Sequence, residues 1–100
     1  MSKCVGTFLA YGSFCIEVKN LFVIYGDVEM DNNCELNNGM EVLVHCYRRL
    51  SISREIHAIE FVRKPDREYI GICINYDDSE ERDILVALNV GDEICEIHDS

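Results

Sequence analysis

The chain has 100 residues, 48% of them hydrophobic, and a formal net charge of −10. Its length fits one domain over residues 1–100, and its apolar content excludes an intrinsically disordered chain. The charge disfavours direct nucleic-acid binding, because Lys and Arg make most phosphate contacts, and it favours a basic protein partner.

Short apolar runs separated by turn residues open the chain. Val5–Tyr11 and Phe14–Val18 predict two strands, with Gly12-Ser13 as the turn between them. Lys19-Asn20 interrupts the pattern before a third apolar strand, Leu21–Met30. The N-terminal part of the chain is therefore expected to be β-structure.

Asparagine-rich segments predict the next two turns. Asp31-Asn32-Asn33 suits a loop, because Asp and Asn side chains bond to nearby backbone. Asn37-Asn38-Gly39 suits a tight turn with two successive positive φ angles. Glu41–Leu50 alternates between apolar and polar residues, which predicts a strand with one buried face. The apolar face holds Val42, Val44, Cys46 and Leu50, and the polar face holds Glu41, His45 and Arg49.

Two further strands are expected after a break at Ser51-Ile52-Ser53. Glu55–Val62 alternates but slips near Ala58-Ile59, which indicates a β-bulge. Residues 63–67 form a proline-containing turn, and Tyr69–Tyr76 follows as a strand. The buried face of that strand is expected to carry Ile70, Ile72 and Ile74.

The pattern becomes helical after this strand. Asp78-Ser79-Glu80-Glu81 combines a capping side chain with acids in the first turn, which predicts a helix start. Asn89-Val90-Gly91-Asp92 is expected to end the helix, and Glu93–His98 to form a closing strand. The apolar helix face holds Ile84, Leu85 and Leu88. These elements together predict an all-β fold, a small closed β-barrel of about six or seven strands with one short helix near the C-terminus.

Three glycine-containing segments also carry a family resemblance. They are Gly26-Asp27-Val28, Leu36-Asn37-Asn38-Gly39-Met40-Glu41-Val42-Leu43-Val44 and Tyr69-Ile70-Gly71-Ile72-Cys73-Ile74. Their order resembles the second domain of translational GTPases, the β-barrel of elongation factor Tu and its relatives, over about residues 14–97. The resemblance implies a barrel that binds other macromolecules. It does not imply GTP hydrolysis, because the phosphate-binding motif Gly-x-x-x-x-Gly-Lys-Ser/Thr is missing from the sequence.

No catalytic or metal-binding motif is apparent in the sequence. The close Cys-x-x-Cys pairs of structural zinc sites are missing, and adjacent His45 and Cys46 on a strand point to opposite faces. The acid pairs Asp77-Asp78 and Glu80-Glu81 fit a solvated helix start better than a catalytic dyad. Without a basic groove, the aromatic residues are expected to pack in the core and on the surface rather than stack on bases. We therefore expect no enzymatic activity, no cofactor and no bound metal.

The six cysteines and the N-terminal sequence indicate the cellular compartment. No secretory signal and no membrane-length apolar run is evident, so a cytoplasmic location without membrane association is expected. Several cysteines lie inside apolar runs, where free cysteine packs as a small hydrophobe. Six reduced thiols are therefore expected.

Charge is distributed unevenly along the chain. Six of the nine basic residues lie between positions 48 and 67, whereas the segment from Asp77 onward has nine acids and only Arg82. We predict that exposed acids in this segment bind a basic protein partner. The expected partner-binding residues are Asp77, Asp78, Glu80, Glu81 and Asp83. The rival interpretation pairs them within the molecule, with Arg48, Arg49, Arg63 and Lys64.

The function predicted from these features is a non-enzymatic acidic binding protein. Its most concrete form is an inhibitor or immunity-type protein that neutralises a basic toxin or nuclease. The alternative is a stand-alone interaction module like the β-barrel of a translation factor.

Overall fold

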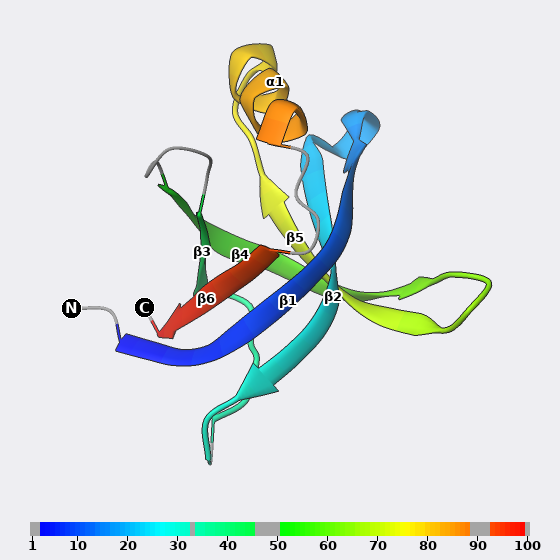
Figure 1. The fold of residues 1–100 in the computed structure, drawn as a ribbon. Helices are drawn as coiled ribbons and strands as arrows, with labels where there is room; N and C mark the ends of the chain where they lie inside the picture. Colours follow the sequence, from blue (N-terminus) through cyan, green and yellow to red (C-terminus); the bar gives the residue numbers. More distant parts are fainter. Residues whose placement is uncertain (1–2, 33, 46–50, 89–92, 100) are drawn as a thin grey trace.

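The computed structural model describes residues 3–32, 34–45, 51–88 and 93–99. Strands and helices occupy most of them (Figure 1). The strands are β1 (Lys3–Ile16), β2 (Leu21–Met30), β3 (Glu41–His45), β4 (Ser51–Arg63), β5 (Glu68–Asn75) and β6 (Glu93–Asp99). A short 3-10 helix (Glu17–Lys19) joins β1 to β2, and α1 (Ser79–Leu88) follows β5.

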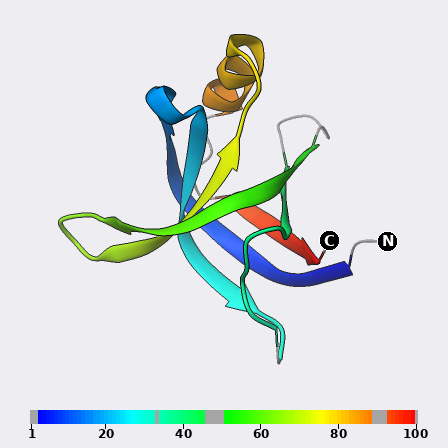
Figure 2. The same ribbon diagram turned by 180° about the vertical axis from the view of Figure 1, so that it is seen from behind.

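The strands form a closed antiparallel barrel in the order β1-β2-β5-β4-β3-β6. The last strand, β6, lies between β1 and β3 and closes the barrel. Figures 1 and 2 show α1 beyond one end of the barrel and the β4–β5 hairpin projecting sideways. The predicted small closed barrel with one short helix is confirmed. Within the described residues, no helix is both long and apolar enough to cross a membrane.

The barrel interior is filled by apolar side chains that alternate along each strand. Val42, Val44, Ile72 and Ile74 are buried, as their alternation predicted. Ile70 is only half-buried, because it lies where the β4–β5 hairpin leaves the barrel and packs at the margin of the core. The largest fully buried side chains are Phe8, Phe22, Ile24, Val42, Ile56, Ile72, Ile74, Cys95 and Ile97.

The neighbouring strands β2 and β5 are buried on both faces. All residues of Leu21–Ile24 and of Gly71–Ile74 are buried. Leu21, Val23 and Cys73 form a second apolar cluster, separate from the main core. Continuous apolar runs, rather than alternation, are the sequence pattern of strands covered on both sides.

Two predicted interruptions are wrong. Gly12-Ser13 is no turn, because β1 continues to Ile16 through a register shift between Ala10 and Gly12. A glycine inside a strand often marks such a bulge. Ser51-Ile52-Ser53 is no break, because Ser51 pairs with His45 and begins β4. The partner strand β3 supplies the hydrogen-bond ladder that the local sequence does not suggest.

The predicted bulge in β4 and the turn between β4 and β5 are confirmed, whereas the predicted geometry of the asparagine-rich turn is corrected. The β4 bulge lies between Ile56 and Ala58, and the hairpin turn closes with Lys64 N donating to Arg67 O at 2.9 Å. At Asn37-Asn38-Gly39 only Gly39 has a positive φ (91°), so the predicted pair of positive angles is wrong. One positive φ at the third turn position is what a type II turn requires. Predictions at residues 33, 46–50 and 89–92 lie outside the described residues.

We expect Ile72→Ala to lower the free energy of unfolding by about 2–5 kcal/mol, the usual cost of an unfilled core position. Ile72 is fully buried between β2 and β4. Urea denaturation measures the change. Val18→Ala is the control, because Val18 is 93% exposed and should change the free energy by less than about 0.5 kcal/mol. Equal effects of the two substitutions would contradict the barrel core.

Gly26→Ala is expected to destabilise the fold through backbone crowding. A methyl group at Gly26 would overlap the Leu9 carbonyl oxygen on β1, and a backbone atom cannot move aside cheaply. Overpacking of this kind costs about 1–3 kcal/mol or more. Gly39→Ala is the comparison, since open space surrounds Gly39 and only its positive φ opposes alanine. Thermal unfolding should show the larger loss for Gly26→Ala.

Candidate functional site

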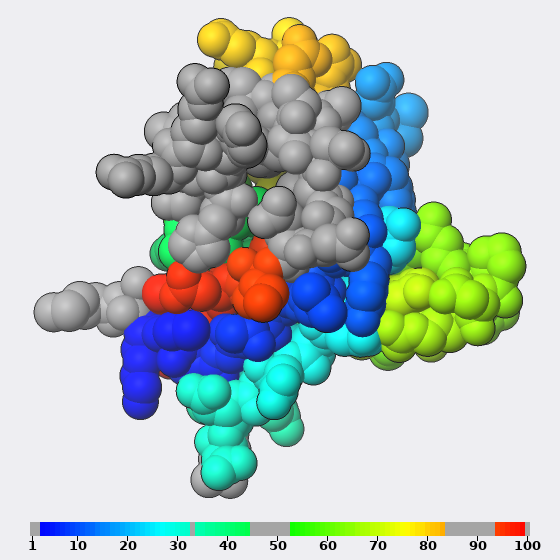
Figure 3. Space-filling model, viewed as in Figure 1, coloured from blue at the N-terminus to red at the C-terminus, as the bar shows by residue number. Residues whose placement is uncertain are grey.

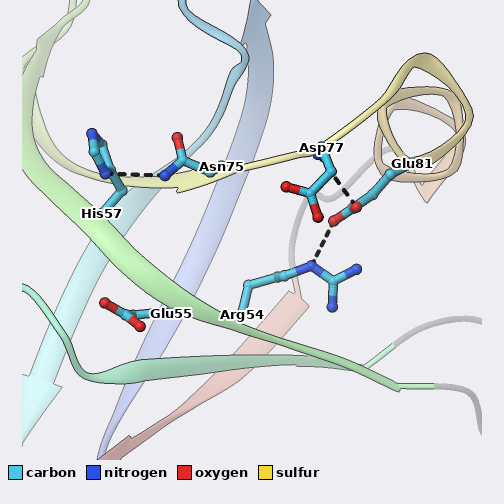
Figure 4. A pocket seen from close by; sticks show the side chains of 6 residues that line it. All are labelled: Arg54, Glu55, His57, Asn75, Asp77 and Glu81. Atoms are coloured by element: carbon cyan, nitrogen blue, oxygen red, sulfur yellow. Dashed lines mark hydrogen bonds and ion pairs between the residues drawn. The ribbon is translucent and has the colours of Figure 1, made fainter.

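A polar cleft lies between β4, the end of β5 and the start of α1 (Figure 4). Its volume is about 270 Å³. It is lined by Arg54, Glu55, His57, Asn75, Asp77 and Glu81. We call this the acidic cleft, because three carboxylates surround one guanidinium and one imidazole.

Hydrogen bonds fix most of the cleft lining. Arg54 Nε donates to Glu81 Oε1 at 2.7 Å, and the Asp77 backbone N donates to Glu81 Oε2 at 3.4 Å. Asn75 Nδ2 lies 3.1 Å from His57 Nδ1. The Arg54–Glu81 ion pair is partly shielded, with side chains 37% and 20% exposed. This pair joins β4 to α1 and holds the helix start against the barrel.

After the Arg54–Glu81 pair is taken into account, the remaining charge in the cleft is negative. Arg54 neutralises Glu81, whereas the carboxylates of Glu55 and Asp77 make no hydrogen bond or ion pair with any described residue. Both residues are exposed. The arrangement suits a positively charged side chain entering from solvent, which would meet two carboxylates with free lone pairs.

The five predicted partner-binding residues gather at the start of α1 but do not share one role. Asp78 caps the helix, with Oδ1 accepting from Glu81 N at 2.8 Å. Asp83 pairs with Arg82 at 3.1 Å. Asp77 lines the cleft, Glu80 is exposed, and Glu81 pairs with Arg54. The predicted helix start is therefore confirmed, whereas partner binding by these residues stays a prediction.

Two of the bases that the sequence suggested for the rival intramolecular pairing, Arg63 and Lys64, have other partners. Arg63 lies 3.6 Å from Glu68, and the ammonium of Lys64 lies over the Tyr25 ring, so neither meets the acids of α1. Arg54 takes that role instead. Arg48 and Arg49 lie outside the described residues.

Sequence reasoning missed the β4 and β5 members of the cleft. Arg54, Glu55, His57 and Asn75 belong to strands that are distant from α1 in the chain. The one local signal was the predicted bulge, which falls at His57 between Ile56 and Ala58. Bulges re-aim side chains and recur beside functional sites.

A second surface cluster, made of aromatic rings and basic side chains, lies beside the β4–β5 hairpin. Tyr69 packs against Tyr11 and Tyr25, each at a ring-centroid distance of 5.5 Å, and Phe14 lies 6.2 Å from Tyr25. The Arg67 guanidinium lies 4.2 Å from the Tyr69 ring centroid. Arg67 and Lys64 therefore lie over the three tyrosine rings, in agreement with the predicted packing role of the aromatics.

Ion pairing in this surface cluster shifts acid–base equilibria. The hydrogen bond from Arg67 to Asp27, at 2.7 Å, lowers the pKa of the Asp27 carboxyl. The hydrogen bond to Asp27 raises the pKa of the Tyr11 hydroxyl. In the interior, burial raises the pKa of the Cys73 thiol, which keeps it protonated and disfavours a nucleophilic role.

Scans with protein-family models and searches of curated proteins and of solved structures found no match to this chain. The resemblance to the second domain of translational GTPases therefore stays a prediction.

The Arg67–Asp27 pair predicts an acid-dependent loss of stability. Because the folded pKa of Asp27 lies below the ordinary value of 3.8, its contribution is present above that pH and disappears as pH falls through the folded pKa. Asp27→Asn should therefore lose less stability between about pH 5 and pH 2 than the unmodified protein. Urea midpoints across this range measure the difference.

Asp31→Asn is the control for this titration, since Asp31 is exposed and its carboxylate makes no hydrogen bond with described residues. It should reproduce the unmodified pH profile. Part of the acid dependence should persist in Asp27→Asn, because hydrogen bonding to Tyr69 also lowers the pKa of Asp66. Identical profiles for Asp27→Asn and the unmodified protein would contradict the prediction.

Proposed function

We propose that this protein is a non-enzymatic cytoplasmic binding protein whose acidic cleft receives basic side chains of a partner protein. The most concrete form is an inhibitor or immunity-type protein that covers the basic active site of a toxin or nuclease. The observation that carries the proposal is a pair of carboxylates, Glu55 and Asp77, that line a cleft of about 270 Å³ and that no described basic residue neutralises.

The exposed acids around the cleft extend this surface. Asp78, Glu80 and Asp83 lie on or beside the first turn of α1 and are exposed. Among the described residues, only Asp83 of these three acids has a basic neighbour within ion-pair distance, Arg82. A negative patch of this kind accelerates encounter with a basic surface and disfavours acidic competitors.

The internal pairs support a recognition surface that is formed in advance. Glu81 uses both carboxylate oxygens within the molecule, and the His57 ring is held by Asn75. Side chains that are already fixed lose less conformational entropy when a partner binds. The free carboxylates therefore have a rigid frame on which to bind a guanidinium or ammonium group.

The partner is to be found by affinity capture and mass spectrometry, and then purified for kinetics. We expect Asp77→Asn/Glu80→Gln to lower its association rate and flatten the salt dependence, because rim charges act mostly on encounter. These two exposed acids are chosen because Asp78 and Glu81 also stabilise α1. Stopped-flow association at several salt concentrations makes the measurement.

Glu29→Gln/Glu35→Gln is the matched control, with the same charge change on exposed acids of β2 and the β2–β3 connection. Figure 1 shows that connection at the end of the molecule opposite α1. Equal slowing by the two double variants would mean that net charge alone matters, and it would refute the acidic cleft as the binding site.

A further inference from the structure

Three potential metal ligands converge on the outer face of the barrel, away from α1. The Cys4 Sγ, a Glu96 carboxylate oxygen and a His98 ring nitrogen all lie within 4.8 Å of one another. Cys4 is on β1 and pairs directly with His98 on β6. Figure 3 shows these neighbouring strands, β1 in blue and β6 in red, together on one face of the molecule.

Strand geometry explains why these side chains meet. Cys95 and Ile97 are buried in the barrel, so Glu96 and His98 point outward from β6, two residues apart on the same face. Cross-strand pairing then brings Cys4 beside His98. The three ligands are thus set by the register of a ladder and not by a flexible loop.

His98 supplies an independent sign that a ligand belongs here. Both ring nitrogens are shielded from solvent and make no hydrogen bond with any residue that the structure describes. Nε2 lies 3.4 Å from Glu96 Oε1, near enough for electrostatic attraction but without hydrogen-bond alignment. A buried nitrogen without a hydrogen-bond partner costs free energy. Such an atom in a folded protein therefore needs an explanation, and a metal ion bound to the ring would provide it.

We propose that Cys4, Glu96 and His98 form a zinc site. A thiolate, an imidazole and a carboxylate are all established Zn²⁺ ligands, and three protein ligands leave the fourth tetrahedral position open to water. Calcium and magnesium require mainly oxygen ligands and do not suit this set. Zinc binding would deprotonate Cys4 and replace its weak contact with the Gly6 carbonyl oxygen, now 3.5 Å long.

The location gives such an ion a structural effect. The metal would link the N-terminal end of β1 to the C-terminal end of β6, next to the place where β6 joins β3 and closes the barrel. An ion that binds the folded chain and not the unfolded chain raises the stability of the fold.

The sequence prediction of no metal rested on the lack of closely spaced ligand pairs. Cys4 and His98 are near opposite ends of the chain, so only strand pairing makes them neighbours. This site is separate from the acidic cleft, and neither proposal depends on the other.

The test is a titration of the reduced, tag-free protein with cobalt(II), followed by displacement with zinc. We expect one equivalent of cobalt to give a thiolate-to-cobalt charge-transfer band, which zinc abolishes. Cys4→Ser should remove the band. His98→Ala and Glu96→Gln should weaken cobalt binding at least roughly tenfold. Even the loss of a residue that only hydrogen-bonds to a metal ligand lowers metal affinity by about that factor.

Matched controls are His57→Ala and Cys34→Ser, which change the same residue types at described positions outside the cluster. They should bind as the unmodified protein does. Zinc should also raise the thermal midpoint and protect Cys4 from alkylation, mapped by mass spectrometry, which tests the site without any substitution. Absence of a charge-transfer band, or its loss in Cys34→Ser but not in Cys4→Ser, would overturn the proposal.

Discussion

Closure of the barrel by β6 is the constraint on which the rest of the structure depends. This strand pairs with β1 on one side and with β3 on the other, so the first and last strands of the described chain become neighbours. Closure removes the unpaired strand edges that invite aggregation. It also fixes which side chains face inward, because a register shift of one residue would turn Cys95 and Ile97 outward and expose the core.

The same closure assembles chemistry on the outside of the barrel. Cys4 meets His98 only because β1 and β6 pair, and Arg54 reaches Glu81 only because β4 lies alongside β5, from which α1 departs. The two outer sites thus lie on different parts of one rigid frame, one at the end of the barrel near α1 and one on the β1–β6 face. A rigid frame holds side chains in place at a lower entropic cost than a loop does.

Charge in this molecule is separated rather than matched. Arg63, Lys64 and Arg67 belong to the projecting β4–β5 hairpin or its ends, while the acids between Asp77 and Asp83 lie on and beside α1. Figures 1 and 2 show the hairpin and the helix extending in different directions. The hairpin cations are occupied by Asp27, Glu68 and the tyrosine rings, so they do not neutralise the acids at the helix start.

The sequence by itself determined the fold class, β2, most of β4 and β5, the helix cap at Asp78 and most of the core, because alternation, capping and turn chemistry are local properties. It failed at Gly12-Ser13 and Ser51-Ile52-Ser53, where the partner strand decides whether the chain stays extended. It also predicted the exposed acids at the start of α1, but not the β4 and β5 residues that line the acidic cleft with them. Only the tertiary structure decided which acids Arg54 neutralises and which stay free, and only it brought Cys4 to His98, because strand register sets contacts between residues far apart in the chain.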